Sequence, residues 1–134
     1  MNKKFELIKN DSIKIGEHKL YRLQALIDFN DVKAGDLGGY VESENNLSQM
    51  DNCWIYDNAC VFENARVFGN ASVYDNARIS GNARVTDNAC VYGDAHVYGN
   101  THISGIASIF DHAYVCANAT ISGKANIYNN THIF

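Results

Sequence analysis

The sequence predicts an all-β protein, a triangular single-strand β-solenoid with 18 residues in each coil and a small β-rich N-terminal cap. Three observations predict this fold. A six-residue word repeats without insertion from Ile55 to Ile133. Along one column, an aromatic residue returns at every eighteenth position. The chain also contains no Pro but ten Gly and eight Tyr, a composition that suits regular strands and tight corners.

Each six-residue word carries one aliphatic residue, preceded two positions earlier by a small residue. The aliphatic residues are Ile55, Val61, Val67, Val73, Ile79, Val85, Val91, Val97, Ile103, Ile109, Val115, Ile121, Ile127 and Ile133. A period of six does not match the 3.6-residue period of a helix, and turn signals come too often for an array of hairpins. Short strands joined by tight corners fit, with the aliphatic and small residues inward and their neighbours outward.

The corners of the repeat are Asn residues, usually preceded by Gly or Asp. Asn tolerates a positive φ better than most residues, so we expect Asn to turn the chain. We also expect stacked Asn side chains to hydrogen-bond along the solenoid axis, as amide ladders do in cross-β stacks.

The residues that follow the aliphatic position indicate that three words make one lap. Taken every 18 residues, one series is wholly aromatic, whereas the other two are mixed. The aromatic series is Tyr56, Tyr74, Tyr92, Phe110 and Tyr128. Three words per lap make the cross-section triangular and place these rings about 4.8 Å apart in one stripe.

The pattern Val-x-(Gly/Asp)-Asn-Ala-x, over residues 39–134, resembles the hexapeptide repeat of left-handed β-helix proteins. The left hand comes from this resemblance, since β-crossovers are otherwise right-handed. The segment AGDLGG at residues 34–39, which runs into the repeats, resembles small prophage-type proteins. Many hexapeptide proteins are acyltransferases, so the resemblance implies that activity as one alternative, although a fold alone does not determine function.

We interpret residues 1–38 as the cap and residues 39–134 as the hexapeptide-repeat β-helix. Apolar and polar residues alternate over 3–9, 12–15 and 18–27, which predicts short strands with a turn at Gly16-Glu17. Val41 and Leu47 are predicted as the first aliphatic rungs. A cap is expected at this end because an open solenoid coil exposes its core and an unpaired strand edge.

The opposite end has no such cover in the sequence, which stops within a repeat. Ile127, Ile133 and Phe134 lie near the expected rim. The unpaired strand edges of an uncovered coil can hydrogen-bond to the strands of another chain. We therefore expect homo-oligomerisation through the C-terminal coil, most simply as a homodimer; the alternative is a short, frayed last coil.

Charge and composition narrow the range of possible functions. The net charge is −4 with acids and bases mixed along the chain, which does not indicate direct nucleic-acid binding. No signal-peptide core or membrane-length apolar run is present, so we expect a cytoplasmic protein with no membrane association and reduced cysteines. Cys53, Cys60, Cys90 and Cys116 are expected too far apart for disulfides.

The sequence predicts no catalytic residue, no metal site and no cofactor. Hexapeptide acyltransferases use a His as general base, but His96 and His132 share a column two coils apart, about 10 Å. No loop interrupts the repeat to build a concave substrate pocket. Arg66 and Arg84, which share a column on another face, are interpreted as solvated surface residues.

The aromatic column is the predicted binding surface for a protein partner, together with Ile106, an apolar residue at a corner normally occupied by Asn. The alternative is a ladder that only stabilises the fold. The leading hypothesis is a non-enzymatic binding protein that docks a macromolecular partner. One specific form is a phage-encoded inhibitor of a bacterial defence complex of the CRISPR type, or of a nucleic-acid-processing complex. An acyltransferase and a self-assembling structural rod are the alternatives.

Overall fold

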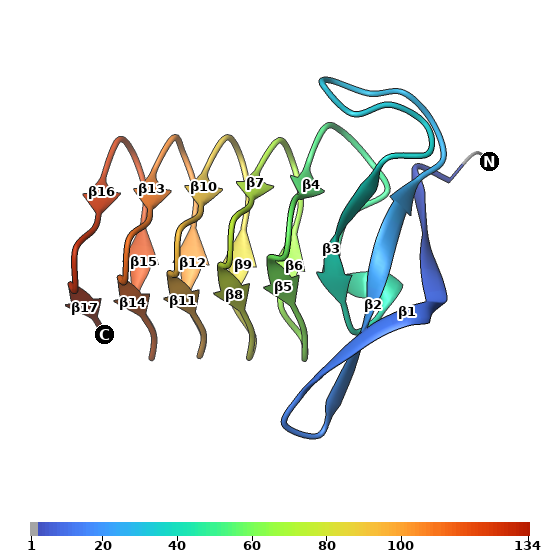
Figure 1. Ribbon diagram of the computed structural model, residues 1–134. Helices are drawn as coiled ribbons and strands as arrows, with labels where there is room; N and C mark the ends of the chain where they lie inside the picture. Colours follow the sequence, from blue (N-terminus) through green and yellow to red (C-terminus); the bar gives the residue numbers. More distant parts are fainter. Residues whose placement is uncertain (1–2) are drawn as a thin grey trace.

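The predicted solenoid is confirmed by a computed structural model, which describes residues 3–134. In Figure 1 the chain passes from β4 at the top to β5 in front and β6 behind, then returns to β7 one coil farther on, which is a left-handed path. The solenoid strands are β4 (Trp54–Ile55), β5 (Cys60–Val61), β6 (Arg66–Val67), β7 (Ser72–Val73), β8 (Arg78–Ile79), β9 (Arg84–Val85), β10 (Cys90–Val91), β11 (His96–Val97), β12 (His102–Ile103), β13 (Ser108–Ile109), β14 (Tyr114–Val115), β15 (Thr120–Ile121), β16 (Asn126–Ile127) and β17 (His132–Ile133).

Three parallel sheets form the sides of the triangle. We call the sheet of β4, β7, β10, β13 and β16 the aromatic face, and the sheet of β6, β9, β12 and β15 the arginine face. The third sheet, with β5, β8, β11, β14 and β17, also contains β1, β2 and β3, and we call it the hairpin face. Paired residues are 18 positions apart, as in Ser72 opposite Cys90, so the predicted coil length is confirmed.

The interior is filled by the aliphatic and small residues, as predicted. The aliphatic residue of every word from Ile55 to Val115 is fully buried, and so are the alanines beside the corners as far as Ala113. Val41 and Leu47, the predicted first rungs, are buried as well and lie opposite Val61 and Val67. Close packing of this single narrow core holds the coils together.

The corners differ from the prediction in one respect. The positive φ falls on the residue before Asn, which is usually Gly or Asp, as in Gly99 (φ 73°) and Asp75 (φ 58°). The acids have a specific role there: Asp57 Oδ2 accepts the Asp75 N–H at 3.2 Å, and Asp75 Oδ2 accepts the Gly93 N–H at 3.1 Å. A carboxylate at this position therefore satisfies a backbone donor of the next coil.

The predicted Asn ladder is present at the corner between the hairpin and arginine faces. Asn82 Nδ2 donates to Asn100 Oδ1 at 3.1 Å, and Asn100 Nδ2 donates to Asn118 Oδ1 at 3.2 Å. Asn therefore joins neighbouring coils through its side chain, while the preceding residue makes the turn.

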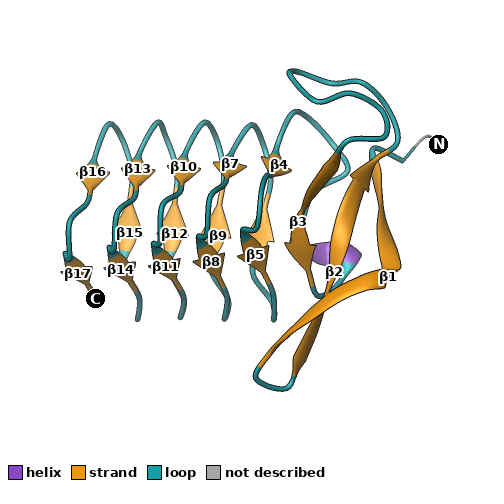
Figure 2. Ribbon diagram, in the orientation of Figure 1, coloured by secondary structure: helices purple, strands orange, loops and turns teal. Residues whose placement is uncertain are grey.

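The cap is an antiparallel extension of the hairpin face (Figure 2). Strand β1 (Phe5–Ile15) pairs with β2 (His18–Ala25), β2 pairs with β3 (Leu37–Val41), and β3 runs parallel to β5. β1 is one continuous strand with an irregularity between Ile8 and Ser12, where two strands were predicted. A short 3-10 helix, η1 (Glu44–Asn46), leads into the first coil.

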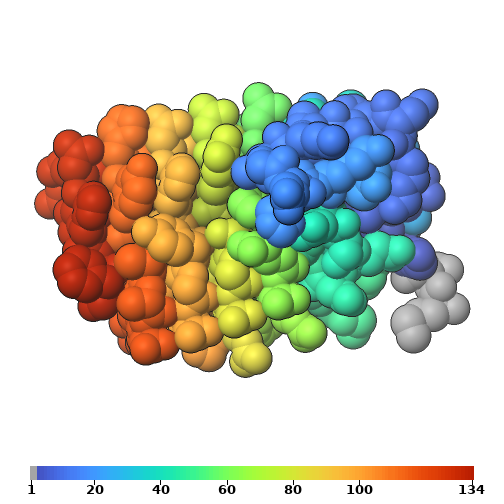
Figure 3. Space-filling view, turned by 90° about the horizontal axis from the view of Figure 1, so that it is seen from below, coloured from blue at the N-terminus to red at the C-terminus, as the bar shows by residue number. Residues whose placement is uncertain are grey.

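The tip of the β1–β2 hairpin folds over the outside of the first coils, as the blue atoms over green in Figure 3 show. Leu20, Tyr40, Cys60 and Phe62 form a second apolar cluster there. His18 lies against the Phe62 ring at 5.4 Å between centroids, and its Nδ1 is 2.9 Å from Glu42 Oε2. Within residues 3–134, no helix is long and apolar enough to cross a membrane.

Candidate functional site

The rings of the predicted aromatic column do stack. Tyr74 and Tyr92 are parallel with centroids 4.7 Å apart, Tyr92 and Phe110 are 5.0 Å apart, and Phe110 and Tyr128 are 5.5 Å apart. Their side chains come from successive coils of the aromatic face, directly after β7, β10, β13 and β16. Tyr74, Tyr92 and Phe110 are half-buried by their neighbours, whereas Tyr128 is 47% exposed. The result is one continuous strip of offset aromatic surface.

The first coil departs from this arrangement because the cap covers it. Tyr56 meets Tyr74 edge-on, with an interplanar angle of 86°, and its hydroxyl donates to Asp31 Oδ1 at 2.8 Å. Trp54, in the neighbouring column, is buried beneath Phe5 and Phe29. The open part of the strip therefore begins at Tyr74.

A hollow of about 390 Å³ lies where the cap loop meets the strip. It is lined by Asn30, Asp31, Tyr56, Asp57, Ser72, Tyr74 and Cys90. Burial raises the pKa of Tyr74 to about 12. Burial, followed by the hydrogen bond to Asp31, also raises the pKa of Tyr56. Both phenols are therefore neutral at physiological pH and offer hydrogen bonds without charge.

Carboxylates border the strip along the corner toward the hairpin face. Asp57, Asp75 and Asp111 directly follow aromatic residues of the column, and Asp94 lies on the same corner. Asp111 Oδ2 accepts the Asn129 N–H at 3.0 Å, which repeats the arrangement of Asp57 and Asp75. Asp57, Asp75 and Asp111 are thus held by backbone hydrogen bonds, and they make this border of the strip negative.

The opposite border carries the predicted corner residue Ile106. Its side chain is 51% exposed, so an apolar residue faces solvent where the neighbouring coils have Asn88 and Lys124. Within residues 51–134, Lys124 is the one Lys or Arg at the corners or in the outward columns of the aromatic face. The face as a whole combines aromatic, apolar and acidic groups.

The histidines do not converge on a site. His96 and His132 share a column of the hairpin face, as predicted, but Tyr114 lies between them and stacks on both, at 5.0 and 4.9 Å. Sequence reasoning missed this second ladder, although reading that column every 18 residues would have found it. Burial, and then the charge of Arg78, lower the pKa of His96, so its imidazole is neutral at pH 7.

Cysteine and metal chemistry add little. All four cysteines are free. Burial raises the pKa of the Cys60 thiol to about 11, so this thiol is protonated under the apolar cluster. Within residues 3–134, no three His, Cys, Asp or Glu side chains are grouped so that they could hold a metal ion.

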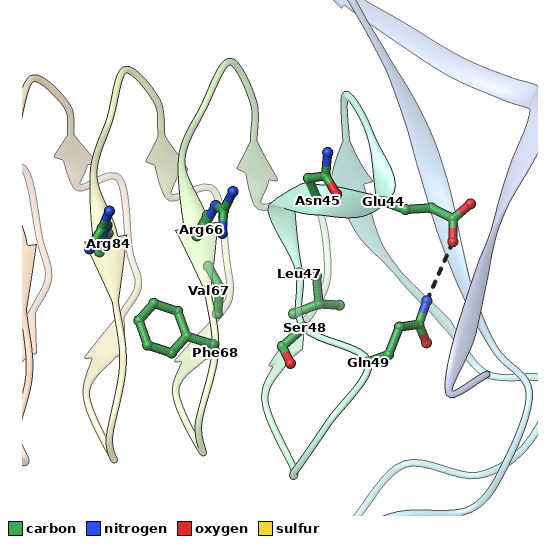
Figure 4. A pocket seen from close by; sticks show the side chains of 9 residues that line it. All are labelled: Glu44, Asn45, Leu47, Ser48, Gln49, Arg66, Val67, Phe68 and Arg84. Atoms are coloured by element: carbon green, nitrogen blue, oxygen red, sulfur yellow. Dashed lines mark hydrogen bonds between the residues drawn. The ribbon is translucent and has the colours of Figure 1, made fainter. Parts of the chain in front are cut away.

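The arginine face, in contrast, is not featureless. Arg66 and Arg84 occupy paired positions on β6 and β9, and both line two adjoining hollows of about 440 and 520 Å³. Figure 4 shows the first hollow, with the two arginines on neighbouring strands, Phe68 at its edge and Glu44 turned toward Gln49. The arginine face therefore has open concave surface beside the uninterrupted repeat.

The repeat is similar to repeats of known proteins. Residues 77–93 match the family model described as the YdcK beta solenoid repeat. The chain is also 51% identical over 37 residues to a protein of Escherichia coli (strain K12) named "Uncharacterized acetyltransferase YdcK". That match covers 28% of this chain and 11% of the relative, so the likeness is confined to a stretch of the repeats. Together with the stacked coils of the structure, this likeness fits a hexapeptide-repeat-like β-solenoid protein.

Proposed function

We propose that the protein is a non-enzymatic docking protein, and that the strip from Tyr74 to Tyr128 binds a protein partner. The observation that carries the proposal is the parallel stack of Tyr74, Tyr92, Phe110 and Tyr128 on one open face. Rigid aromatic side chains give large contact areas and lose little entropy on binding, which is why they dominate protein interfaces. Ile106 extends the apolar area on the other border of the face.

The acidic border indicates what the partner presents. Asp57, Asp75 and Asp111 are held in place by backbone hydrogen bonds, so a partner with Arg or Lys side chains opposite them gains electrostatic complementarity. A nucleic acid would instead meet a repulsive edge, since its phosphates carry the same charge. We therefore favour a protein partner with a basic segment.

A more specific form of the proposal is a phage-encoded inhibitor of a bacterial defence complex of the CRISPR type, or of a nucleic-acid-processing complex, acting in the cytoplasm. Its supports are the resemblance to prophage-type proteins and the shape, a rigid rod with one binding strip. Complexes that bind nucleic acids have basic surfaces, which an acidic strip with aromatic residues would fit.

Self-association through the last coil completes the proposal. Strands β15, β16 and β17 each end their sheet, so their outer edges are unpaired in the described chain. Phe134 is 84% exposed, and Ile127 and Ile133 are partly buried beside it. Joining two such coils about a two-fold axis would cover these edges and give a homodimer.

The test of docking is affinity capture from bacterial lysate with three proteins side by side. These are the wild type, the double variant Tyr74→Ser/Tyr92→Ser, and Tyr98→Ser as matched control, because Tyr98 is an exposed tyrosine of the hairpin face. Each lost ring contact costs only about 0.2–1 kcal/mol of stability, so the double variant should remain folded, which circular dichroism checks. We expect one protein to be captured by the wild type and the control and to be lost from the double variant. Equal capture by all three would contradict the proposal.

One observation favours a second candidate, an acyltransferase: the Escherichia coli relative that shares part of the repeat is named an uncharacterized acetyltransferase. His96, neutral because its pKa is lowered, is the side chain to test as a base. The readout is release of free coenzyme A from acetyl-coenzyme A with simple amine acceptors. This candidate predicts turnover that His96→Ala abolishes, whereas the docking proposal predicts no turnover by either protein.

A further inference from the structure

The arginine face carries a like-charge pair that the fold does not explain. Arg66 and Arg84 are directly opposite each other in the β6–β9 register, at a strand spacing of about 4.8 Å, and both side chains are exposed. Like charges directly opposite each other on neighbouring strands destabilise a sheet. Within residues 3–134, neither guanidinium has an ion pair or a side-chain hydrogen bond, since the ion pairs found there involve other cations.

The comparison with the acidic corner shows how unusual this pair is. Asp57 and Asp75 are also like charges on neighbouring coils, but their carboxylates accept backbone N–H groups of the next coil and so have a structural role. Arg66 and Arg84 have no corresponding partner. Two unpaired cations in register lower the stability of the sheet and make no compensating contact within it. Residues that lower stability in this way are typical of binding sites.

The surroundings of the pair favour an anion. The larger hollow contains no carboxylate: it is lined by Arg66, Arg84, His102, Thr101 and the amide column of Asn64, Asn82 and Asn100. The smaller hollow contains Glu44 alone, whose Oε1 is already 3.1 Å from Lys3 Nζ and 3.5 Å from Gln49 Nε2. His102 follows Arg84 in the same column one coil on. Glu63, which lines a separate small hollow with Arg66, already accepts the Gly81 N–H at 3.0 Å. Within the described chain, the two arginines therefore have no ion-paired carboxylate and lie beside polar groups that can hydrogen-bond a ligand.

We propose that Arg66 and Arg84 form a binding site for a phosphate dianion, either free or carried by an organic molecule. A planar carboxylate with one charge is matched by a single guanidinium fork. A tetrahedral oxyanion with two charges has oxygens on several sides, so it can accept hydrogen bonds from both forks and relieve their repulsion. Phe68, at the edge of the smaller hollow, lies where the organic part of a phosphomonoester would extend. The site is on a different face from the aromatic strip and does not depend on the docking proposal.

The test measures binding of inorganic phosphate and of phenyl phosphate by titration calorimetry, with ionic strength held constant by sodium chloride. The variants are Arg66→Gln and Arg84→Gln. Arg78→Gln is the matched control, because Arg78 is an exposed arginine of the hairpin face whose column neighbours are Cys60 and His96. We expect each site variant to weaken binding at least tenfold, and the control to remain within twofold of the wild type.

Two further measurements distinguish free phosphate from a phosphomonoester and test the repulsion between the two arginines. Tighter binding of phenyl phosphate than of phosphate, reduced by Phe68→Leu, identifies a phosphomonoester as the ligand, whereas equal binding identifies free phosphate. In phosphate-free buffer, Arg84→Gln should unfold at the same temperature as the wild type or higher, because it removes a repulsion. The absence of saturable binding of either probe up to tens of millimolar, or an equal loss in Arg78→Gln, would overturn the proposal.

Discussion

The two consecutive glycines of β3 provide a stringent test of the packing between cap and solenoid. A Cβ added at Gly39 would collide with the carbonyl oxygen of Ala59 and lie 2.5 Å from Ile55 Cγ2. Ordinary carbon contacts are 3.5–4.0 Å, so the neighbours would have to move by about 1 Å. They resist, because one is backbone and the other is a stiff β-branched side chain that is fully buried. The variant Gly39→Ala should therefore be strongly destabilised.

Overpacking of this kind costs about 1–3 kcal/mol, and we expect Gly39→Ala at the upper end, about 3 kcal/mol. With an unfolding entropy of about 0.28 kcal/mol/K for a chain of this length, Tm falls by about 10 °C. The matched control is Gly16→Asn, because Asn tolerates the φ of 60° at Gly16 and a Cβ there meets nothing within 4 Å. Differential scanning calorimetry measures both. A Tm for Gly39→Ala within 3 °C of the wild type would refute the reasoning.

Three other predictions concern the cap, pH and assembly. Lys4→Met should lower the free energy of unfolding by about 1–3 kcal/mol, measured in urea, because the buried Lys4 ammonium donates to three carbonyl oxygens of the first coil. The hydrogen bond between His18 and Glu42 raises the His18 pKa above 6.5 and lowers the Glu42 pKa below 4.5. The stability from this pair is therefore complete between about pH 4.5 and 6.5, and it is lost as pH rises through the His18 pKa or falls through the Glu42 pKa. The difference in Tm between wild type and His18→Gln should follow that window; a constant difference from pH 5 to 9 would contradict it. Deletion of residues 129–134 should reduce the proposed homodimer to a monomer by size-exclusion chromatography with light scattering, and an unchanged mass would count against assembly through the last coil.

The repeat was predictable from the sequence because the residues that form its core and its aromatic column each recur at a fixed interval. Val or Ile at every sixth position determines the core, and the aromatic residue at every eighteenth position determines the triangle. The corner prediction was wrong by one residue, because Asn and the Gly or Asp before it both tolerate a positive φ. The structure distinguishes them by φ, which is positive at Asp57 and not at the following Asn, and by hydrogen bonds: Asp57 accepts a backbone N–H, whereas Asn82 donates along the amide ladder.

The features that the sequence did not predict depend on contacts made by segments that do not follow the six-residue repeat. The cap loop that covers Trp54 and binds Tyr56 is irregular, so no pattern places Asp31 beside the aromatic column. The alternation over residues 3–27 predicted strands, but not their joining to the hairpin face as one sheet. Arg66 and Arg84 were visible as a column, yet the smaller of the two hollows beside them is formed partly by η1, whose position only the structure gives.

The central claim is that function resides in the aromatic strip rather than in a catalytic pocket. The most direct measurement is the Kd between the purified protein and its captured partner, determined by titration calorimetry for wild type, Tyr74→Ser/Tyr92→Ser and Tyr98→Ser. Central aromatic residues of an interface contribute about 2 kcal/mol or more each, so the double variant should bind at least 100-fold more weakly, with Tyr98→Ser unchanged. A double-variant Kd within threefold of the wild type, in a folded protein, would contradict the account.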